Sequence, residues 1–138
     1  MGSRPVSVLR VVDGDTLQVR RGGRDVTVRL IGIDTPEVDW YGGEAGCFGA
    51  RAGRFAMRLL DGRRVRLELD RERLDPYGRT LAYLYLPDGR MLNVVLVRRG
   101  IAQVTIYPPN DRHEERLRRA EATARAEGAG LWSACPTA

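Results

Sequence analysis

The sequence contains no lysine, and several other residue types are scarce. All 23 basic residues are arginine, and there are only one histidine and two cysteines. No segment approaches the ~20 consecutive apolar residues of a membrane-spanning helix, so we expect a soluble protein without a membrane partner. The single histidine, His113, has no nucleophile with which to build a catalytic triad. We expect it to make a structural hydrogen bond at the start of the last helix, with Glu68 as the candidate partner.

The arginines outnumber the acidic residues and make the chain basic. Eighteen acids leave a net charge of +5 and a pI near 9.9. A guanidinium group keeps its charge at any working pH and can hold phosphate through two hydrogen bonds, which favours a polyanionic partner. The alternative is that genomic base composition replaced lysine with arginine and that the charge serves only solubility.

Length and composition indicate one compact unit. A chain of 138 residues with 43% apolar residues can build a single hydrophobic core, so we expect one domain over residues 1–138. We expect residues 1–5 to be disordered or left over from expression, with a natural leader peptide removed. The chain shows no large uncommitted apolar stripe, which predicts a monomer.

Apolar periodicity predicts an α+β domain built around a small β-barrel. Alternating patterns indicate strands, and longer patterns bounded by glycine indicate helices. The last helix is expected to begin with a capping box, in which Asp111 caps and Glu114 reaches back. The predicted strands cover 6–12, 16–20, 25–33, 65–69 and 80–86, and the predicted helices cover 49–60, 92–99 and 111–127.

Three carboxylates stand at turns of the predicted sheet. Asp15 lies in the turn between the first two strands, and Asp34 and Glu37 follow the third strand. If the third strand pairs beside the first two, the carboxylates converge and repel one another unless a cation or protons neutralise them. Oxygen ligands without a nearby His or Cys suit Ca²⁺ or Mg²⁺ rather than Zn²⁺.

Two arginines complete the pattern. Arg29 precedes Asp34 in the same strand, and Arg79 ends the segment Asp75-Pro76-Tyr77-Gly78-Arg79. Carboxylates that hold a metal and orient water, opposite guanidinium groups that stabilise extra negative charge, are typical of a phosphoryl-transfer site.

These motifs, in this order, resemble the staphylococcal (thermonuclease) family of Ca²⁺-dependent nucleases over nearly the whole chain. The resemblance implies a five-stranded OB-fold-type β-barrel with three α-helices. It also implies hydrolysis of DNA and RNA at the 5′ P–O bond, leaving 3′-phosphate ends. The matching segments are 12–16, 29–37, 75–79, 81–83, 93–100, 107–110, His113 and 130–132.

The resemblance also implies roles for single residues. Asp15, Asp34 and the carbonyl of Thr35 would bind Ca²⁺ directly. Asp13 would support these ligands without touching the ion. Glu37 would hold or deprotonate the attacking water, although a metal-held water could instead lose its proton to solvent.

On the substrate side, the resemblance implies that Arg29 stabilises the five-coordinate phosphorane and that Arg79 grips the phosphate. Tyr77 would contact the nucleotide through its hydroxyl, and Tyr107 would pack against a base. The chain has Pro76 and Thr105 where family members can carry a lysine and a second tyrosine, so we expect a weaker grip on substrate.

Cys47 and Cys135 are an even pair in a nuclease-like chain, which predicts a disulfide and therefore export to the cell envelope or beyond. Two reduced thiols in a cytoplasmic protein are the alternative.

Two rival functions remain open on the sequence. A catalytically weak module of the same fold could bind nucleic acid or protein, although such a module has no need for three carboxylates beside two arginines. The second rival function is a structural cation site that only joins two strands.

Overall fold

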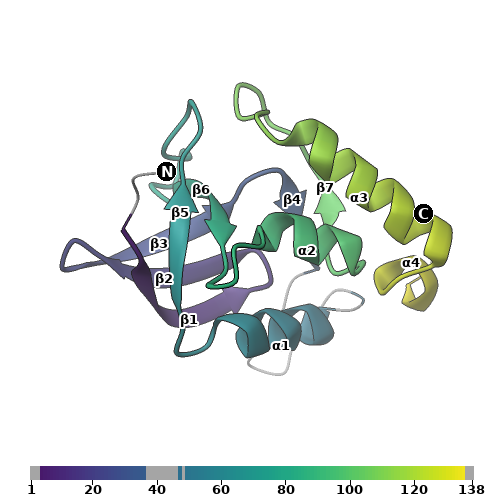
Figure 1. Ribbon diagram of the computed structural model, residues 1–138, viewed down its shortest axis with the longest axis horizontal. Helices are drawn as coiled ribbons and strands as arrows, with labels where there is room; N and C mark the ends of the chain where they lie inside the picture. Colours follow the sequence, from purple (N-terminus) through teal and green to yellow (C-terminus); the bar gives the residue numbers. More distant parts are fainter. Residues whose placement is uncertain (1–3, 37–46, 48, 136–138) are drawn as a thin grey trace.

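The computed structural model describes residues 4–36, 47 and 49–135. Glu37 therefore lies outside the described residues. Five strands form a closed barrel in the order β1-β2-β3-β6-β5 (Figure 1). They are β1 (Val6–Asp13), β2 (Thr16–Arg21), β3 (Arg24–Leu30), β5 (Arg64–Glu68) and β6 (Thr80–Tyr85).

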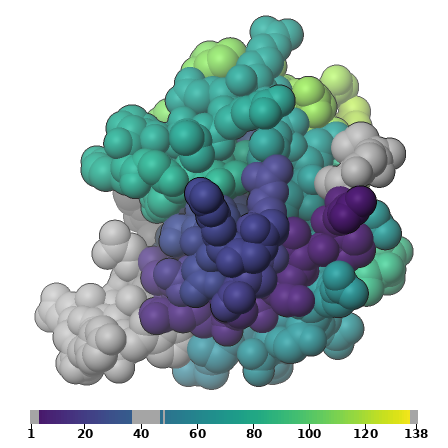
Figure 2. All heavy atoms as spheres, turned by 90° about the vertical axis from the view of Figure 1, so that its left-hand side faces the viewer, coloured from purple at the N-terminus to yellow at the C-terminus, as the bar shows by residue number. Residues whose placement is uncertain are grey.

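The barrel confirms the predicted fold class. β3 and β6 pair in parallel, whereas β1–β2, β2–β3, β5–β6 and β1–β5 are antiparallel. The strands form here because β-branched and other apolar side chains alternate with polar ones, so that one face of each strand can be buried. Figure 2 looks onto the β2–β3 turn, with residues of the β5–β6 connection above it.

Helices cover one end and one side of the barrel. The predicted helices are α1 (Gly49–Leu60), α2 (Leu92–Arg98) and α3 (Glu114–Glu127), and a short α4 (Leu131–Ala134) follows them. α1 lies across the lower end of the barrel in Figure 1, and α2 and α3 pack against each other beside it. In the described part of the chain, no helix is long and apolar enough to cross a membrane.

The third strand is shorter than predicted. β3 ends at Leu30, and Gly32, with a φ of +81°, turns the chain before β4 (Ile33–Asp34) begins. β4 then pairs with β7 (Gln103–Val104) rather than with the barrel. This separate ribbon carries Asp34.

The predicted capping box is wrong. α3 begins only at Glu114, and the residue before it, His113, makes no capping bond through its side chain. The Glu114 carboxylate accepts a hydrogen bond from Arg118 Nε at 2.7 Å, one turn along the helix, instead of reaching back. An i,i+4 ion pair therefore takes the carboxylate that the box would have used.

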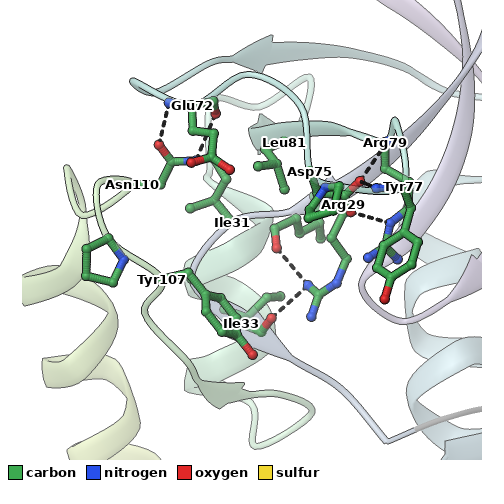
Figure 3. Close-up of a pocket in the computed structure, with 14 residues that line it drawn as sticks. Arg29, Ile31, Ile33, Glu72, Asp75, Tyr77, Arg79, Leu81, Tyr107 and Asn110 are labelled. Atoms are coloured by element: carbon green, nitrogen blue, oxygen red, sulfur yellow. Dashed lines mark hydrogen bonds and ion pairs between the residues drawn. The ribbon is translucent and has the colours of Figure 1, made fainter.

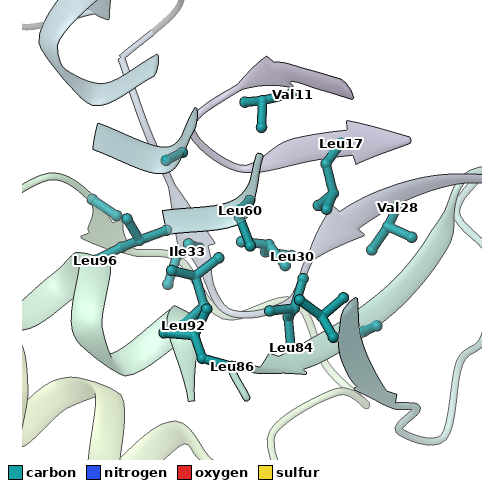
Figure 4. Packing of buried hydrophobic residues seen from close by; sticks show 14 of the residues in the cluster. Val11, Leu17, Val28, Leu30, Ile33, Leu60, Leu84, Leu86, Leu92 and Leu96 are labelled. Carbon is teal, nitrogen blue, oxygen red and sulfur yellow. The ribbon is translucent and has the colours of Figure 1, made fainter. Parts of the chain in front are cut away.

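The hydrophobic core fills the barrel and continues under the helices (Figure 4). Leu17, Val28 and Leu84 point inward from the barrel strands and are almost fully buried. Leu60 from α1 and Leu96 from α2 close the core from outside the sheet. The strands that carry the candidate site are thereby held on a rigid support.

Candidate active site

The structure brings Asp15, Arg29 and Asp34 together at the end of the barrel strands. Arg29 Nη2 lies 3.4 Å from Asp15 Oδ2 and 3.2 Å from Asp34 Oδ1. Asp15 begins the hairpin from β1 into β2, Arg29 is in β3, and Asp34 is in β4. The convergence predicted from the turn motifs is thus present for these two carboxylates.

Arg29 is fixed by backbone as well as by carboxylates. Its Nη1 donates to the carbonyls of Leu30 at 2.8 Å and of Ile33 at 2.7 Å. The side chain is only 16% exposed, so little of its freedom remains to be lost on binding a substrate. The guanidinium therefore both closes the β3–β4 turn and is oriented in advance at the site.

Asp15 organises the other side of the cluster. It is 6% exposed and accepts hydrogen bonds from Thr16 Oγ1 and from the backbone N–H of Thr35, each at 2.9 Å. The backbone carbonyl of Asp15 accepts from the N–H of Leu30. Asp13, the predicted supporting residue, is half-buried at the end of β1. Asp15 thereby ties the β1–β2 turn to the Asp34–Thr35 segment.

A groove of about 440 Å³ opens beside this cluster (Figure 3). We call it the active-site groove. One wall is the end of β3 with the turn into β4, and the other comes from the loop between β5 and β6 and from residues 107–110. Arg29 and Arg79 both line it, as do Tyr77 and Tyr107. The two predicted phosphate-binding residues and the two predicted nucleotide-binding residues therefore share one hollow.

Asp75 holds Arg79 in place. Its Oδ2 accepts from Arg79 Nε at 2.6 Å, and its Oδ1 accepts from the backbone N–H groups of Arg79 and Tyr77, both at 2.9 Å. Burial of the Asp75 carboxyl alone would raise its pKa, but these bonds from Arg79 and Tyr77 outweigh it and hold the pKa below the ordinary value. The sequence analysis assigned no role to Asp75 and so missed this positioning role.

The two tyrosines project from the walls of the groove. Tyr77 is 84% exposed and Tyr107 is 71% exposed, which is unusual for rings of this size. Figure 3 shows Tyr107 beside Ile33 and Tyr77 beside Arg79, whose guanidinium carbon lies 5.7 Å from the Tyr77 ring centre. Neither ring is buried in the hydrophobic core, and both are accessible to a ligand.

A side-chain clamp that the sequence analysis did not find joins the two loops of the groove. Asn110 Oδ1 accepts from the N–H of Glu72 at 2.8 Å, and Asn110 Nδ2 donates to the carbonyl of Glu72 at 2.9 Å. Asn110 is 5% exposed, so this pair of bonds is shielded from water. An asparagine after the Pro108-Pro109 pair was the only signal in the sequence.

The donor set fits a hard cation. Asp15, Asp34 and the Thr35 carbonyl offer only oxygen, and one guanidinium beside two carboxylates leaves net negative charge. Thr35 Oγ1 is buried and has no hydrogen-bond partner among the described residues, so one polar group beside the candidate cation site is left unsatisfied. No three His, Cys, Asp or Glu side chains converge within the described ranges, and the third predicted carboxylate, Glu37, lies outside them.

His113 takes the structural place expected for it. Its Nε2 lies 2.8 Å from Glu68 Oε1, and its ring meets that of Tyr83 edge to face. Tyr83 donates its hydroxyl to Asp70 at 2.7 Å, and burial together with Asp70 raises the pKa of Tyr83. This network joins the start of α3 to the barrel, and none of its four residues lines the active-site groove.

Cys47 and Cys135 form a disulfide, as the sequence predicted. The bond joins the segment before α1 to the residue after α4, across 88 positions of sequence. A second hollow is lined by both cysteines together with Asp34, Thr35 and Trp132. The disulfide therefore lies close to the candidate metal-binding segment.

Comparison with known proteins agrees with this arrangement. The sequence profile described as "Staphylococcal nuclease homologue" matches residues 27–134. The chain is 43% identical over 125 residues to the thermonuclease of Staphylococcus intermedius, covering 91% of this chain and 74% of that protein. The chain belongs to the staphylococcal nuclease family. The matched range holds every predicted site residue of this family member except Asp13, Asp15 and Cys135.

Two further relatives extend the comparison for this staphylococcal nuclease homologue. The thermonuclease of Staphylococcus hyicus is 39% identical over 126 residues, covering 91% of this chain and 74% of that protein. Endonuclease YncB of Bacillus subtilis (strain 168) is 34% identical over 130 residues, covering 93% of this chain and 61% of that protein.

Proposed function

We propose that this protein is a Ca²⁺-dependent nuclease that hydrolyses DNA and RNA at the 5′ P–O bond and leaves 3′-phosphate ends. The observation that carries the proposal is the placement of Arg29 and Arg79 in one groove, beside the carboxylates of Asp15 and Asp34. Two fixed guanidinium groups in a concave site suit a phosphodiester, and the carboxylates suit a cation. Membership of a nuclease family and the nuclease names of the relatives support it.

The arginines would stabilise the charge that develops on the phosphorane. Arg29 is locked by two carbonyls and two carboxylates, and Arg79 is locked by Asp75, so neither needs to reorganise during the reaction. Preorganised donors of this kind account for a large share of catalysis in many enzymes. Arg79 would also assist departure of the 5′-oxygen.

Asp15, Asp34 and the carbonyl of Thr35 would hold Ca²⁺, with Asp13 supporting them from the end of β1. The bound ion would neutralise phosphate charge and lower the pKa of an attached water. We further propose that Glu37 orients this water or accepts its proton.

Tyr77 and Tyr107 would hold the nucleotide. A hydroxyl on one wall and an aromatic face on the other bind bases with little sequence preference, because every base has a π-face. Such a site suits an enzyme that acts on both DNA and RNA, in endo- and exonuclease fashion.

Digestion of single- and double-stranded DNA and RNA, with Ca²⁺, Mg²⁺ or chelator, tests the proposal. We expect cleavage in millimolar Ca²⁺ at mildly alkaline pH, no cleavage with chelator, and 3′-phosphate ends. Arg29→Ala, Arg79→Ala and Glu37→Gln should each lower kcat by more than ~100-fold.

Three outcomes would count against the proposal. Absence of cleavage in Ca²⁺ would reject the proposal that the protein is an enzyme. If nucleic acid still binds, the protein is instead a binding module of the same fold. Loss of stability in chelator without any activity indicates a structural cation site. Near-normal turnover of any one variant removes the role given to that residue.

The disulfide supports a place for this nuclease outside the reducing cytoplasm, in the envelope or the medium. We propose that it acts there as a monomer.

A further inference from the structure

α2 and α3 pack against each other beside the barrel (Figure 1). A further hollow, which we call the arginine groove, lies where α2 meets the start of α3. Four arginines line it, namely Arg90, Arg98, Arg99 and Arg116. Its remaining lining is apolar, and no carboxylate is among the described residues that line it. A concave surface of one charge sign concentrates ions of the other sign.

The charge in this groove is only partly compensated. Arg90 pairs with Asp88 at 2.8 Å and Arg98 with Glu127 at 2.9 Å, but the side chains of both pairs are about half exposed. Exposed pairs of this kind contribute ~0–1 kcal/mol, so phosphate can compete with them. Arg99 lies over the Phe55 ring. Arg116 takes part in no ion pair among the described residues.

A neighbouring surface on α3 provides the contrast. The hollow beside Arg118 and Arg119 is also lined by Glu114 and Glu115. Each of these arginines pairs with the glutamate four residues before it, at 2.7 and 2.9 Å. A mixed surface of this type is a solvated helix face, whereas the arginine groove is not neutralised in the same way.

The two grooves share one buried hydrophobic cluster beneath them. Ile31 and Leu81, which line the active-site groove, belong to the same small hydrophobic cluster as Met91 and Val94, which line the arginine groove. β6 runs from Leu81 to Tyr85, which pairs with Met91, over about 13 Å. A single nucleic-acid strand covers ~4–16 nucleotides on an OB fold, enough to reach both grooves.

We infer that the arginine groove is a second contact for the nucleic-acid backbone, outside the active site, which holds a long strand while a distant phosphodiester is cut. The inference rests on nucleic acid being the substrate of the proposed function. The guanidinium groups would bind phosphates, and the partly exposed Val94 and Val95 would contact sugars or bases. An acidic protein is the other kind of partner that this surface could take.

The test compares two pairs of substitutions that change the net charge equally. Arg90→Gln with Arg116→Gln removes charge from the arginine groove, and Arg118→Gln with Arg119→Gln removes it from the mixed surface of α3. Binding of a fluorescent oligonucleotide of about 20 nucleotides is measured by anisotropy in chelator over a series of salt concentrations. Turnover of a dinucleotide substrate in Ca²⁺ is measured in parallel.

We expect the groove pair to weaken binding of the long strand by about tenfold at low salt and to reduce the salt slope by about 1.4, the value for two phosphates. The control pair should change neither the affinity nor the salt slope by a comparable amount. Both double variants should turn over the dinucleotide at the wild-type rate. An equal loss of affinity in both double variants would show that only the net charge of the protein matters, and it would overturn the inference. Unchanged binding in the groove pair would also overturn it and would leave an acidic protein as the partner to test.

Failure of the proposed function has a different signature. The binding measurement needs neither metal nor cleavage, so it can succeed when the wild-type protein cuts nothing. Conversely, if the wild-type protein cleaves normally and both double variants bind the oligonucleotide equally well, only the role of the arginine groove is rejected.

Discussion

Single side chains in this protein act mainly by holding other side chains. Arg79 is directed toward the active-site groove by Asp75, and Arg29 by two carbonyls and two carboxylates. A group that is misplaced by about 1 Å can lose about 100-fold in rate. The residues that position the arginines should therefore matter almost as much as the arginines.

Asp75→Asn tests this at the residue scale. We expect kcat on a dinucleotide to fall by up to about 100-fold, because the neutral amide no longer fixes Arg79. Because the pKa of Asp75 is lowered on folding, its carboxylate stabilises the protein above its ordinary pKa, and this stabilisation is lost as the pH falls through the lowered value. The stability difference between wild type and variant should shrink over that acidic range.

A matched control lies in the turn after β6. Asp88 accepts from the N–H of Arg90 at 3.0 Å and from Arg90 Nε at 2.8 Å, in the same pattern but away from the active-site groove. Asp88→Asn should leave kcat on the dinucleotide unchanged. Equal effects of the two substitutions would show that Asp75 acts through general stability alone.

At the scale of elements, the C-terminal helices are joined to α2 by a close backbone contact. Gly100, just after α2, has a φ of +72°, and a Cβ placed on it would lie 2.1 Å from the carbonyl oxygen of Ala129. The carbonyl of Gly100 in turn accepts from the N–H of Leu131 at 2.9 Å. The loop before α4 can approach only because this position has no side chain.

Gly100→Ala should therefore destabilise the protein more than the strain of a positive φ alone explains. Gly62, after α1, has a φ of +69° and open space around it, and it serves as the control. We expect Gly62→Ala to cost about 1 kcal/mol and Gly100→Ala about 2 kcal/mol more, measured by urea unfolding. Equal costs would mean that the Ala129 contact relaxes without penalty.

The sequence predicted those elements whose cause is local. Alternation gave the barrel strands, and Gly62, Gly100 and Gly128 marked the ends of three helices. It could not predict β4 and β7, which are two residues each and exist only because they pair with one another. The capping box failed because the pairing of Glu114 with Arg118 is decided by side-chain competition that spacing does not reveal.

The site shows the same division. Turn motifs were enough to predict that Asp15 and Asp34 meet beside Arg29, since adjacent strands bring their ends together. The Asn110–Glu72 clamp joins loops 38 residues apart and has no local signature. The role of Glu37 stays a prediction.

At the scale of the whole molecule, the disulfide constrains most of the chain. It closes 88 positions of sequence between the segment before α1 and the end of α4. Cross-linking a loop of that length stabilises a fold by at most about 4.6 kcal/mol, because it restricts the unfolded chain. The bond therefore accounts for a large part of the 5–15 kcal/mol that is usual for a domain.

Removal of the bond is the corresponding prediction. Cys47→Ser, Cys135→Ser and the double variant should each lower the free energy of unfolding by the same amount, up to about 4.6 kcal/mol, because all three break one bond. Chemical denaturation with and without reductant measures this, and reductant should have no further effect on the variants. Uptake of two alkylating labels by the unreduced wild-type protein would contradict the bond.

The closed barrel has a consequence for the order of folding. β1 pairs with β5, and β3 pairs with β6, so the ring is complete only when Thr80, Leu81 and Ala82 of β6 have joined β3. The chain must lose the conformational entropy of closing long loops before these strand pairings can stabilise it. This cost slows folding and favours an all-or-none transition. A growing chain would thus remain unfolded until β6 has been synthesised, and a polypeptide cut before that strand should show no cooperative melting.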